Sequence, residues 1–298
     1  MITRCHARVD LRLRVFAPDV HGFHGVETLI ARADLADSLE IEETGSGVAI
    51  EVDGAEVEGV PTDEGNLCCA AVREFMAEAF RGRRSAPGVM LRLTKRVPPA
   101  RGLGGGSMDA AATLRLLSAR WPILGPRRLF ALAARLGRDV AFGLLDVPLA
   151  LGWERGGRLL PLRPPRSRPG LLCCPPFGVS TRDAYSWLRE TREVAGAADP
   201  AGGAAALPGA TRLAKWDSIE SLIRNDLEGP VVARHPELKR ALELLRGASP
   251  AAAMSGSGST LFAVFQDEAN RGAAGDAMRA SGCGEVEGWR VLDVRLPT

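Results

Sequence analysis

Residues 98–112 read Pro98-Pro99-Ala100-Arg101-Gly102-Leu103-Gly104-Gly105-Gly106-Ser107-Met108-Asp109-Ala110-Ala111-Ala112, a glycine run that leads directly into a helix-forming segment. Glycine has no Cβ, so the backbone N–H groups of such a run can approach an anion closely. A helix start adds N–H groups without intrahelical partners and the positive end of the helix dipole. The stretch therefore predicts a phosphate-binding loop.

Two common nucleotide-binding loops do not fit this stretch. A Walker loop requires a lysine directly after the glycines, and none is present. The dinucleotide fingerprint requires a third glycine where Ser107 stands. A glycine-rich surface turn that leads into a helix and binds nothing is the plain alternative, and the loop by itself leaves both interpretations open.

Composition indicates an ordinary folded protein and gives no sign of nucleic acid or a membrane as a partner. The 298 residues are 46% hydrophobic and 25% charged, with a net charge of +2. This charge is too small to indicate nucleic acid or a membrane surface. No stretch approaches the roughly 20 apolar residues of a membrane span, and residues 1–8 lack the apolar core of a signal peptide. We therefore expect a cytoplasmic protein.

Cysteine spacing supports the same compartment. Two adjacent pairs, Cys68-Cys69 and Cys173-Cys174, occur without any C-x-x-C motif. This pattern is typical neither of a zinc site nor of a disulfide framework. We expect buried thiols in a reducing compartment.

Periodicity places strands and helices around the glycine loop. Residues 8–16 alternate between apolar and polar, which predicts a strand with Arg8 and Asp10 on one face; most such faces are solvated. Other strands are expected at 91–93 and 261–265. Helical spacing is found at 66–80, 108–120, 126–137 and 225–246, and Asp139 follows the third of these helices.

The order of these elements favours an α+β fold, because strands and helices do not alternate regularly. A turn-rich connector at 163–170 suggests a division into an N-terminal domain (1–162) and a C-terminal domain (163–298). Residues 194–210 are mostly Ala, Gly and Pro and predict a flexible excursion. A second glycine/serine loop occupies residues 254–260.

Several segments, in order and spacing, resemble one family. The loop at 98–112 is similar to the phosphate loop of the GHMP kinases, and most of all to the branch that acts on 4-diphosphocytidyl-2-C-methyl-D-erythritol. Further similar segments are 7–11, 22–29, 61–67, 136–140, 179–181, 225–228 and 254–260. The resemblance implies a two-domain fold with the active site in the cleft between the domains.

The resemblance also implies a reaction, namely transfer of the γ-phosphoryl group of ATP, with Mg²⁺, to the 2-hydroxyl of a cytidine diphosphate-linked polyol. It assigns Asp139 as general base and Arg8 as a catalytic cation beside it. Spacing alone leaves Asp139 equally explicable as a turn residue after a helix. A monomer or a homodimer is compatible with this interpretation.

Binding roles follow from the same resemblance. Asn66 and Lys95 are expected near the adenine, and the Ser107 hydroxyl near the phosphates or the metal ion. Asp10, Phe23, His24 and Thr181 are expected to contact the substrate, with Phe23 stacking on the cytosine. The remaining ATP-binding residues are Pro98, Pro99, Ala100, Arg101, Gly102, Leu103, Gly104, Gly105, Gly106 and Met108.

The chain departs from the family pattern near the expected catalytic centre. Arg8 and Asp10 stand where the family carries Lys and Asn, Met108 replaces a Ser, and Phe23 replaces a Tyr. Arginine and lysine differ in shape and hydrogen-bonding geometry, whereas Asp10 adds a negative charge that Arg8 or Arg12 can neutralise. Two alternatives therefore stay open: a GHMP kinase for another small alcohol, and an ATP-binding homologue with weakened catalysis. An oxidoreductase is a distant third.

Overall fold

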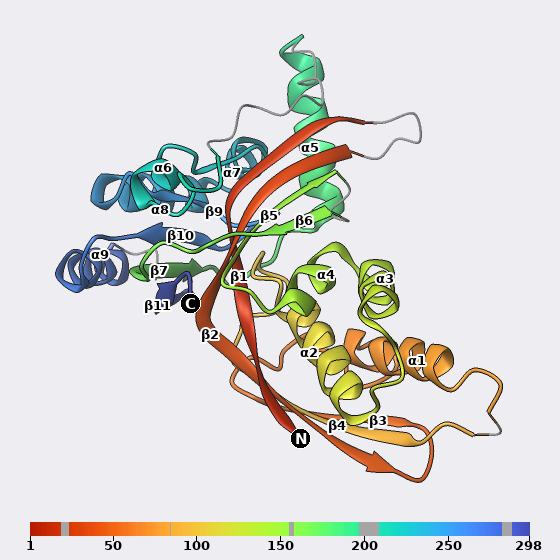
Figure 1. The fold of residues 1–298 in the computed structure, drawn as a ribbon. Helices are drawn as coiled ribbons and strands as arrows, with labels where there is room; N and C mark the ends of the chain where they lie inside the picture. Colours follow the sequence, from red (N-terminus) through yellow and green to blue (C-terminus); the bar gives the residue numbers. More distant parts are fainter. Residues whose placement is uncertain (19–23, 84, 155–157, 197–208, 282–287) are drawn as a thin grey trace. The chain divides into compact units, whose positions relative to one another are not determined.

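The computed structural model describes residues 1–18, 24–83, 85–154, 158–196, 209–281 and 288–298 (Figure 1). These residues form two compact units. Unit 1 comprises residues 1–7, 35–99 and 104–147, and unit 2 comprises residues 8–34, 100–103 and 148–298. The units are discontinuous in sequence, whereas the boundary expected at residue 162 divides the chain once; that boundary stays a prediction.

Strands of unit 1 pair through β4 (Gly88–Lys95). β4 runs antiparallel to the second half of β2 (His24–Thr44), with Leu39 opposite Leu93, and parallel to β3 (Val48–Gly54). Leu91 and Leu93 are buried while Arg92 between them is exposed, which is the alternation expected of a sheet with one covered face.

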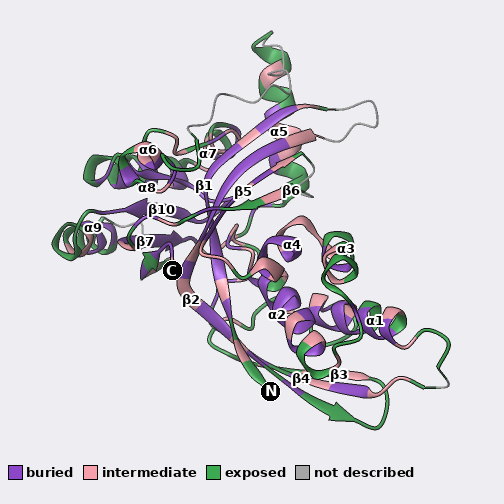
Figure 2. Cartoon of the chain, viewed as in Figure 1, coloured by how far each residue is buried: buried purple, intermediate pink, exposed green. Residues whose placement is uncertain are grey.

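Helices cover that sheet in unit 1 (Figure 1). They are α1 (Leu67–Ala79), α2 (Gly105–Arg120), α3 (Pro126–Leu136) and α4 (Arg138–Leu145). The first three confirm the sequence prediction, although α2 begins at Gly105 rather than at Met108. The fourth corrects it, because Asp139 lies in the first turn of a helix and not in a turn beyond one. Most of α2 is buried (Figure 2).

Unit 2 contains strands from two sheets. The first half of β2 pairs with β5 (Leu149–Glu154), which pairs with β6 (Arg158–Pro161). β1 (Ile2–Pro18) pairs in parallel with the short β8 (Arg224–Asn225), with Leu13 opposite Asn225. The other sheet is antiparallel, in the order β11 (Arg290–Leu296), β7 (Arg168–Cys174), β10 (Leu261–Val264) and β9 (Ala252–Met254).

Helices of unit 2 pack against the antiparallel sheet. Apolar side chains of α8 (Pro236–Ala248) join Leu171 of β7 and Leu261 of β10 in one buried core. The other helices are α5 (Thr181–Val194), α6 (Trp216–Glu220), α7 (Glu228–Arg234) and α9 (Glu268–Ala280). The single helix expected over 225–246 is wrong: α7 ends before His235, because the residue preceding Pro236 is disfavoured in helical conformation.

Of the remaining predictions from the sequence, some are confirmed and others are not. The strand at 8–16 is confirmed and extended to 2–18, but its polar face is not solvated: Arg8, Asp10 and Arg12 are 6%, 4% and 6% exposed. Cysteines at 5, 68, 69, 173 and 174 are buried and free, as expected. Cys283 and most of the excursion at 194–210 lie outside the described residues. Within the described ranges, no helix is both long and apolar enough to cross a membrane.

Candidate active site

The buried polar face of β1 carries an ion pair between two predicted site residues of unit 2. Arg8 Nη1 donates to Asp10 Oδ2, and the other Asp10 oxygen accepts a hydrogen bond of 3.0 Å from Thr28 Oγ1. Arg8 Nη1 also lies 3.4 Å from the carbonyl oxygen of Gly102. The negative charge of Asp10 is therefore compensated by Arg8, one of the two arginines that the sequence analysis named for this role.

Three segments that are far apart in the sequence meet at this pair within unit 2. The Ser255 hydroxyl, from the second glycine/serine loop, donates to Gly102 O at 2.8 Å and accepts from Asp10 N at 3.1 Å. Arg8 N donates to Leu103 O at 2.9 Å. Gly102 has φ +77, and a Cβ there would lie 2.2 Å from Ser255 O, so this close approach requires glycine.

The turn before α5 borders both glycine segments. Thr181 Oγ1 lies 3.2 Å from Ser257 Oγ, and the Ser259 hydroxyl donates to Phe177 O. A Cβ at Gly178 would lie 2.4 Å from Ala100 O. The structure therefore brings Thr181, the first residue of α5, next to the second glycine/serine loop, although the sequence analysis did not predict this helix.

His24, predicted to read the cytosine edge, contacts an aromatic ring that the sequence did not single out. Its Nδ1 lies 2.7 Å from Phe16 O, and its ring centroid lies 5.6 Å from that of Tyr185 in α5. No motif marks Tyr185, and the only signal is that it is the one tyrosine of the chain. Phe23 lies outside the described residues.

In unit 1 the start of α2 has the properties of an anion site. Gly104 is the N-cap in left-handed conformation, φ +68, and no described side chain caps the helix. The first intrahelical bond of the α2 start runs from Met108 N to Gly104 O at 3.0 Å. The N–H groups of Gly105, Gly106 and Ser107 precede that bond, with Gly106 exposed and Ser107 half-buried. These residues fit a phosphate group.

Lys95 lies behind this helix start. A Cβ built at Gly105 would lie 3.3 Å from Lys95 Nζ and 3.2 Å from Val97 Cγ1, so the absent side chain faces the interior of unit 1. Lys95 Nζ donates to Asp109 Oδ2 at 2.8 Å and to Asp37 Oδ2. Lys95 is 1% exposed. Its predicted contact with adenine is not part of this geometry, and its role in ATP binding stays a prediction.

Burial and charge perturb this cluster. Burial raises the pKa of Asp109 to about 7, against the opposing attraction of Lys95. Burial alone would lower the pKa of Lys95, but Asp109 and Asp37 outweigh it and the pKa is raised. Asp109 Oδ1 is buried, and no hydrogen-bond partner for it occurs among the described residues. Asp109 was not among the predicted site residues, although it directly follows the loop.

Asn66 has both side-chain groups engaged in the local fold. It is the N-cap of α1, where Oδ1 accepts from Cys68 N at 2.9 Å and Nδ2 donates to Pro61 O at 2.7 Å. An asparagine is favoured at this position because it satisfies one of the free N–H groups of a helix start. Its predicted role near adenine stays a prediction.

Asp139 lies near the start of α4, and this helix packs on α2 within unit 1. The Asp139 side chain is 17% exposed, with Arg138 Nε 3.7 Å away. A Cβ at Gly143 would lie 2.7 Å from Ala111 Cβ and 3.0 Å from Met108 Cε. Met108, which replaces a serine of the family pattern, is therefore a buried packing residue between the two helices.

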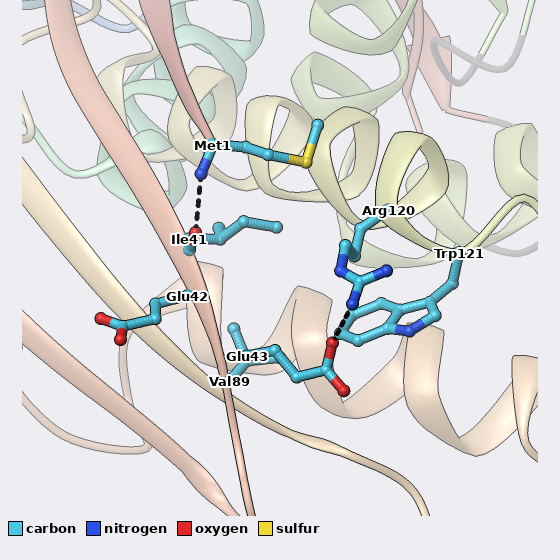
Figure 3. Close-up of a pocket in the computed structure, with 7 residues that line it drawn as sticks. All are labelled: Met1, Ile41, Glu42, Glu43, Val89, Arg120 and Trp121. Atoms are coloured by element: carbon cyan, nitrogen blue, oxygen red, sulfur yellow. Dashed lines mark hydrogen bonds and ion pairs between the residues drawn. The ribbon is translucent and has the colours of Figure 1, made fainter.

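A hollow at the opposite end of α2 is separate from these residues (Figure 3). Its volume is about 220 Å³, and its walls include Met1, Ile41, Glu43, Arg120 and Trp121. Met1 N donates to Ile41 O at 2.9 Å, and Arg120 pairs with Glu43. None of the predicted site residues lines it. Among the described residues, no group of three or more His, Cys, Asp or Glu is arranged to hold a metal ion.

Comparison with known proteins agrees with the motifs. The family model for the GHMP kinases N terminal domain matches residues 66–152, and that for the GHMP kinases C terminal region matches residues 207–282. The chain is 37% identical to a 4-diphosphocytidyl-2-C-methyl-D-erythritol kinase of Anaeromyxobacter dehalogenans, over 99% of this chain and 90% of the relative. The chain belongs to the GHMP kinases.

Further relatives of this GHMP kinase support the assignment. A Deinococcus radiodurans protein of the same name is 37% identical, over 98% of this chain and 92% of the relative. A crystal structure of 4-(cytidine 5'-diphospho)-2C-methyl-D-erythritol kinase has a TM-score of 0.77 at 33% identity and covers 99% of both chains. Homoserine kinase from Cytophaga hutchinsonii, 16% identical with a TM-score of 0.72, shares the fold. The α+β fold class is thereby confirmed, and the chain is an ATP-using small-molecule kinase.

Proposed function

We propose that this GHMP kinase transfers the γ-phosphoryl group of ATP to the 2-hydroxyl of 4-diphosphocytidyl-2-C-methyl-D-erythritol, in the formation of isoprenoid precursors. The observation that carries the choice of substrate is the alignment of nearly the whole chain with kinases that bear this name, at 37% identity over 99% and 98% of its length. The arrangement of the loops in both units is compatible with such a reaction.

ATP phosphates bind, in this proposal, at the start of α2. The N–H groups of Gly105, Gly106 and Ser107 donate to phosphate oxygens, and the helix dipole adds a favourable field. Mg²⁺ bound with ATP supplies further positive charge at the phosphates, and the Ser107 hydroxyl is the side chain we assign to it. The other residues of the 98–108 loop, together with Asn66 and Lys95, complete the proposed ATP site.

Asp139 acts as the general base. Its carboxylate accepts the proton of the acceptor hydroxyl while the oxygen–phosphorus bond forms and the bond between the γ-phosphorus and the departing ADP oxygen breaks. Positioning and charge stabilisation supply most of the rate enhancement in reactions of this kind. Arg8 stabilises the negative charge of the transferring group, and its pairing with Asp10 fixes the guanidinium direction.

The cytidine end of the substrate is recognised, we propose, by residues of unit 2. Phe23 stacks on the cytosine and His24 binds its polar edge, and the contact between His24 and Tyr185 extends this aromatic surface. Thr181 and Asp10 contact the polyol diphosphate portion. We further propose a domain division near residue 162, a cytoplasmic location, and a monomeric or homodimeric state.

An ADP-release assay tests the proposal. Purified protein with Mg-ATP is offered 4-diphosphocytidyl-2-C-methyl-D-erythritol, homoserine or mevalonate in separate reactions. Turnover with the cytidyl substrate alone is expected. Turnover with another alcohol and not with the cytidyl compound would assign a different substrate. ATP binding without turnover of any of them would indicate a homologue with lost catalysis.

A further inference from the structure

Lys95 is the centre of a buried charge cluster whose two aspartates have no role in the proposed reaction. We call Asp37, Lys95 and Asp109 the Lys95 clamp. Their side chains are 0%, 2% and 2% exposed, and Lys95 Nζ bonds to a carboxylate oxygen of each aspartate. One cation thus joins three elements of unit 1, because Asp37 belongs to β2, Lys95 to β4 and Asp109 to α2.

The Lys95 clamp reaches both flanks of the glycine loop. On the incoming side, Asp37 Oδ1 accepts from Arg96 N at 2.5 Å and from Val97 N at 2.8 Å. On the outgoing side, Asp109 lies one helical turn after Gly105 and receives the Lys95 ammonium group. Residues 96–97 and 104–109 all belong to unit 1. The two points at which the loop leaves and re-enters this unit are therefore connected through one side chain.

Geometry also excludes Lys95 from the surface that would face a nucleotide. Its ammonium group lies on the interior side of Gly105, 3.3 Å from the position of an added Cβ. The N–H groups of the first turn point along the helix axis toward its N-terminus. A lysine in this position can support the loop from behind, whereas its Nζ is already bonded to two carboxylates.

We propose that Asp37, Lys95 and Asp109 are positioning residues that fix the phosphate-binding amides of α2, and that Lys95 supports ATP binding without touching the nucleotide. This inference rests on the proposed use of the α2 start for ATP phosphates. It replaces the direct adenine contact predicted for Lys95 from the family resemblance. It also adds Asp37 and Asp109, which no motif assigned.

Binding calorimetry with two ligands tests this inference without any acceptor substrate. The ligands are a non-hydrolysable ATP analogue with an imido bridge between the β- and γ-phosphates, and inorganic tripolyphosphate. The variants are Lys95→Met and Asp109→Asn. We expect each variant to weaken both ligands by about tenfold or more, because displaced amides lose the phosphates of either ligand. Glu220→Gln, which breaks the ion pair of Glu220 with Arg168 outside the site, is the matched control and should bind both ligands normally.

A direct contact gives a different pattern. If Lys95 bound the adenine end, Asp109→Asn would remove one of the two carboxylates that hold the lysine and leave analogue affinity unchanged or improved. Tripolyphosphate binding would then be unaffected by Lys95→Met. Either result overturns the inference. If the unaltered protein bound neither ligand, the proposed function itself would fail. If the unaltered protein bound both ligands and the variants bound them equally well, only the inference about the Lys95 clamp would fail.

Loss of folding is a risk for Lys95→Met, because two carboxylates then face each other in the interior. Asp37→Asn is the second variant, since it weakens the bonds to the Arg96 and Val97 amides and keeps the lysine. Hydrogen exchange of the unaltered protein provides an independent measurement. The Val97 amide should exchange slowly, and rapid exchange there would contradict a fixed loop flank.

Discussion

Arg8 and Asp10 form a buried ion pair on one face of β1, at the two positions where the family resemblance leads us to expect Lys and Asn. A lysine and an asparagine together carry one positive charge, whereas an arginine and an aspartate carry none. The two departures from the family are therefore related physically, because the added carboxylate balances the guanidinium and restricts its direction. Thr28 Oγ1 donates to the Asp10 carboxylate, and the Ser255 hydroxyl accepts from Asp10 N.

Replacing one residue of this pair should reduce stability and activity more than replacing both residues together. Asp10→Asn removes the carboxylate to which the buried Arg8 guanidinium is bonded, and breaking such a pair costs about 3–5 kcal/mol of stability. We expect Asp10→Asn and Arg8→Lys each to lower kcat/KM, and the double variant Arg8→Lys/Asp10→Asn to recover most of it. Kinetics and urea unfolding of all four proteins give the coupling free energy. Additive losses in the double variant would show that the pair does not act as a unit.

Replacement of Asp139 should separate catalysis from binding. Asp139→Asn retains the shape of the side chain but cannot accept a proton, so kcat should fall by about 10²–10⁴-fold while ATP affinity is retained. Steady-state kinetics and calorimetry measure the two quantities. Asp146→Asn, at the other end of α4 and 53% exposed, is the matched control and should keep normal turnover. A normal kcat for Asp139→Asn would remove this residue from the role of general base.

Gly143 controls how closely α4 approaches α2. A Cβ there would lie 2.7 Å from Ala111 Cβ, so α4 would have to move away from α2 to make room for it. Gly143→Ala should lower the free energy of unfolding by about 1–3 kcal/mol through overpacking. It should also lower kcat, since α4 carries Asp139.

A control for Gly143→Ala is provided by Gly247→Ala in α8, where an added Cβ meets no atom within 4 Å. That substitution should raise stability slightly, because alanine favours a helix over glycine by roughly 1 kcal/mol. Thermal unfolding and initial rates compare the two variants. Equal rates for Gly143→Ala and the wild type would show that the position of α4 does not limit catalysis.

Local patterns were sufficient to predict much of the fold. Glycine followed by alanines marked the start of α2, and alternation marked β1, because both signals depend on neighbours in sequence. The break between α7 and α8 was missed although Pro236 was visible, since the apolar spacing continued across it. The helix that carries Asp139 was missed because α4 has only eight residues.

Less of the candidate site could be predicted from the sequence, because its polar side chains bond to residues that are far away in the chain. Nothing near Lys95 in the sequence shows that its ammonium group bonds to Asp37 and Asp109, at separations of 58 and 14 residues. The same holds for Ser255, which reaches Asp10 across 245 residues. Patterns identified which residue types were present, whereas the three-dimensional structure was needed to show which charges were already compensated.

Asp109 should make stability depend on pH in a defined direction. Its pKa is about 7 in the folded protein, against an ordinary value of 3.8, so the folded state holds a proton that the unfolded chain releases. Between about pH 4 and pH 7, stability contributed by this group falls as pH rises, because the unfolded state binds fewer protons there. Asp109→Asn lacks this titration.

The measurement is the free energy of unfolding of wild type and Asp109→Asn in urea, at several pH values. The difference, wild type minus variant, should decrease from about pH 4 to pH 7 and be constant above and below that interval. The neighbours of Asp109 do not add to this difference. The pKa values of Lys95 and of the Cys5 and Cys68 thiols are raised, so these groups keep their protons between pH 4 and pH 7. Asp37 is present in both proteins. A difference that stays constant between pH 4 and pH 7 would show that the attraction of Lys95 outweighs burial and that Asp109 is ionised at all these pH values.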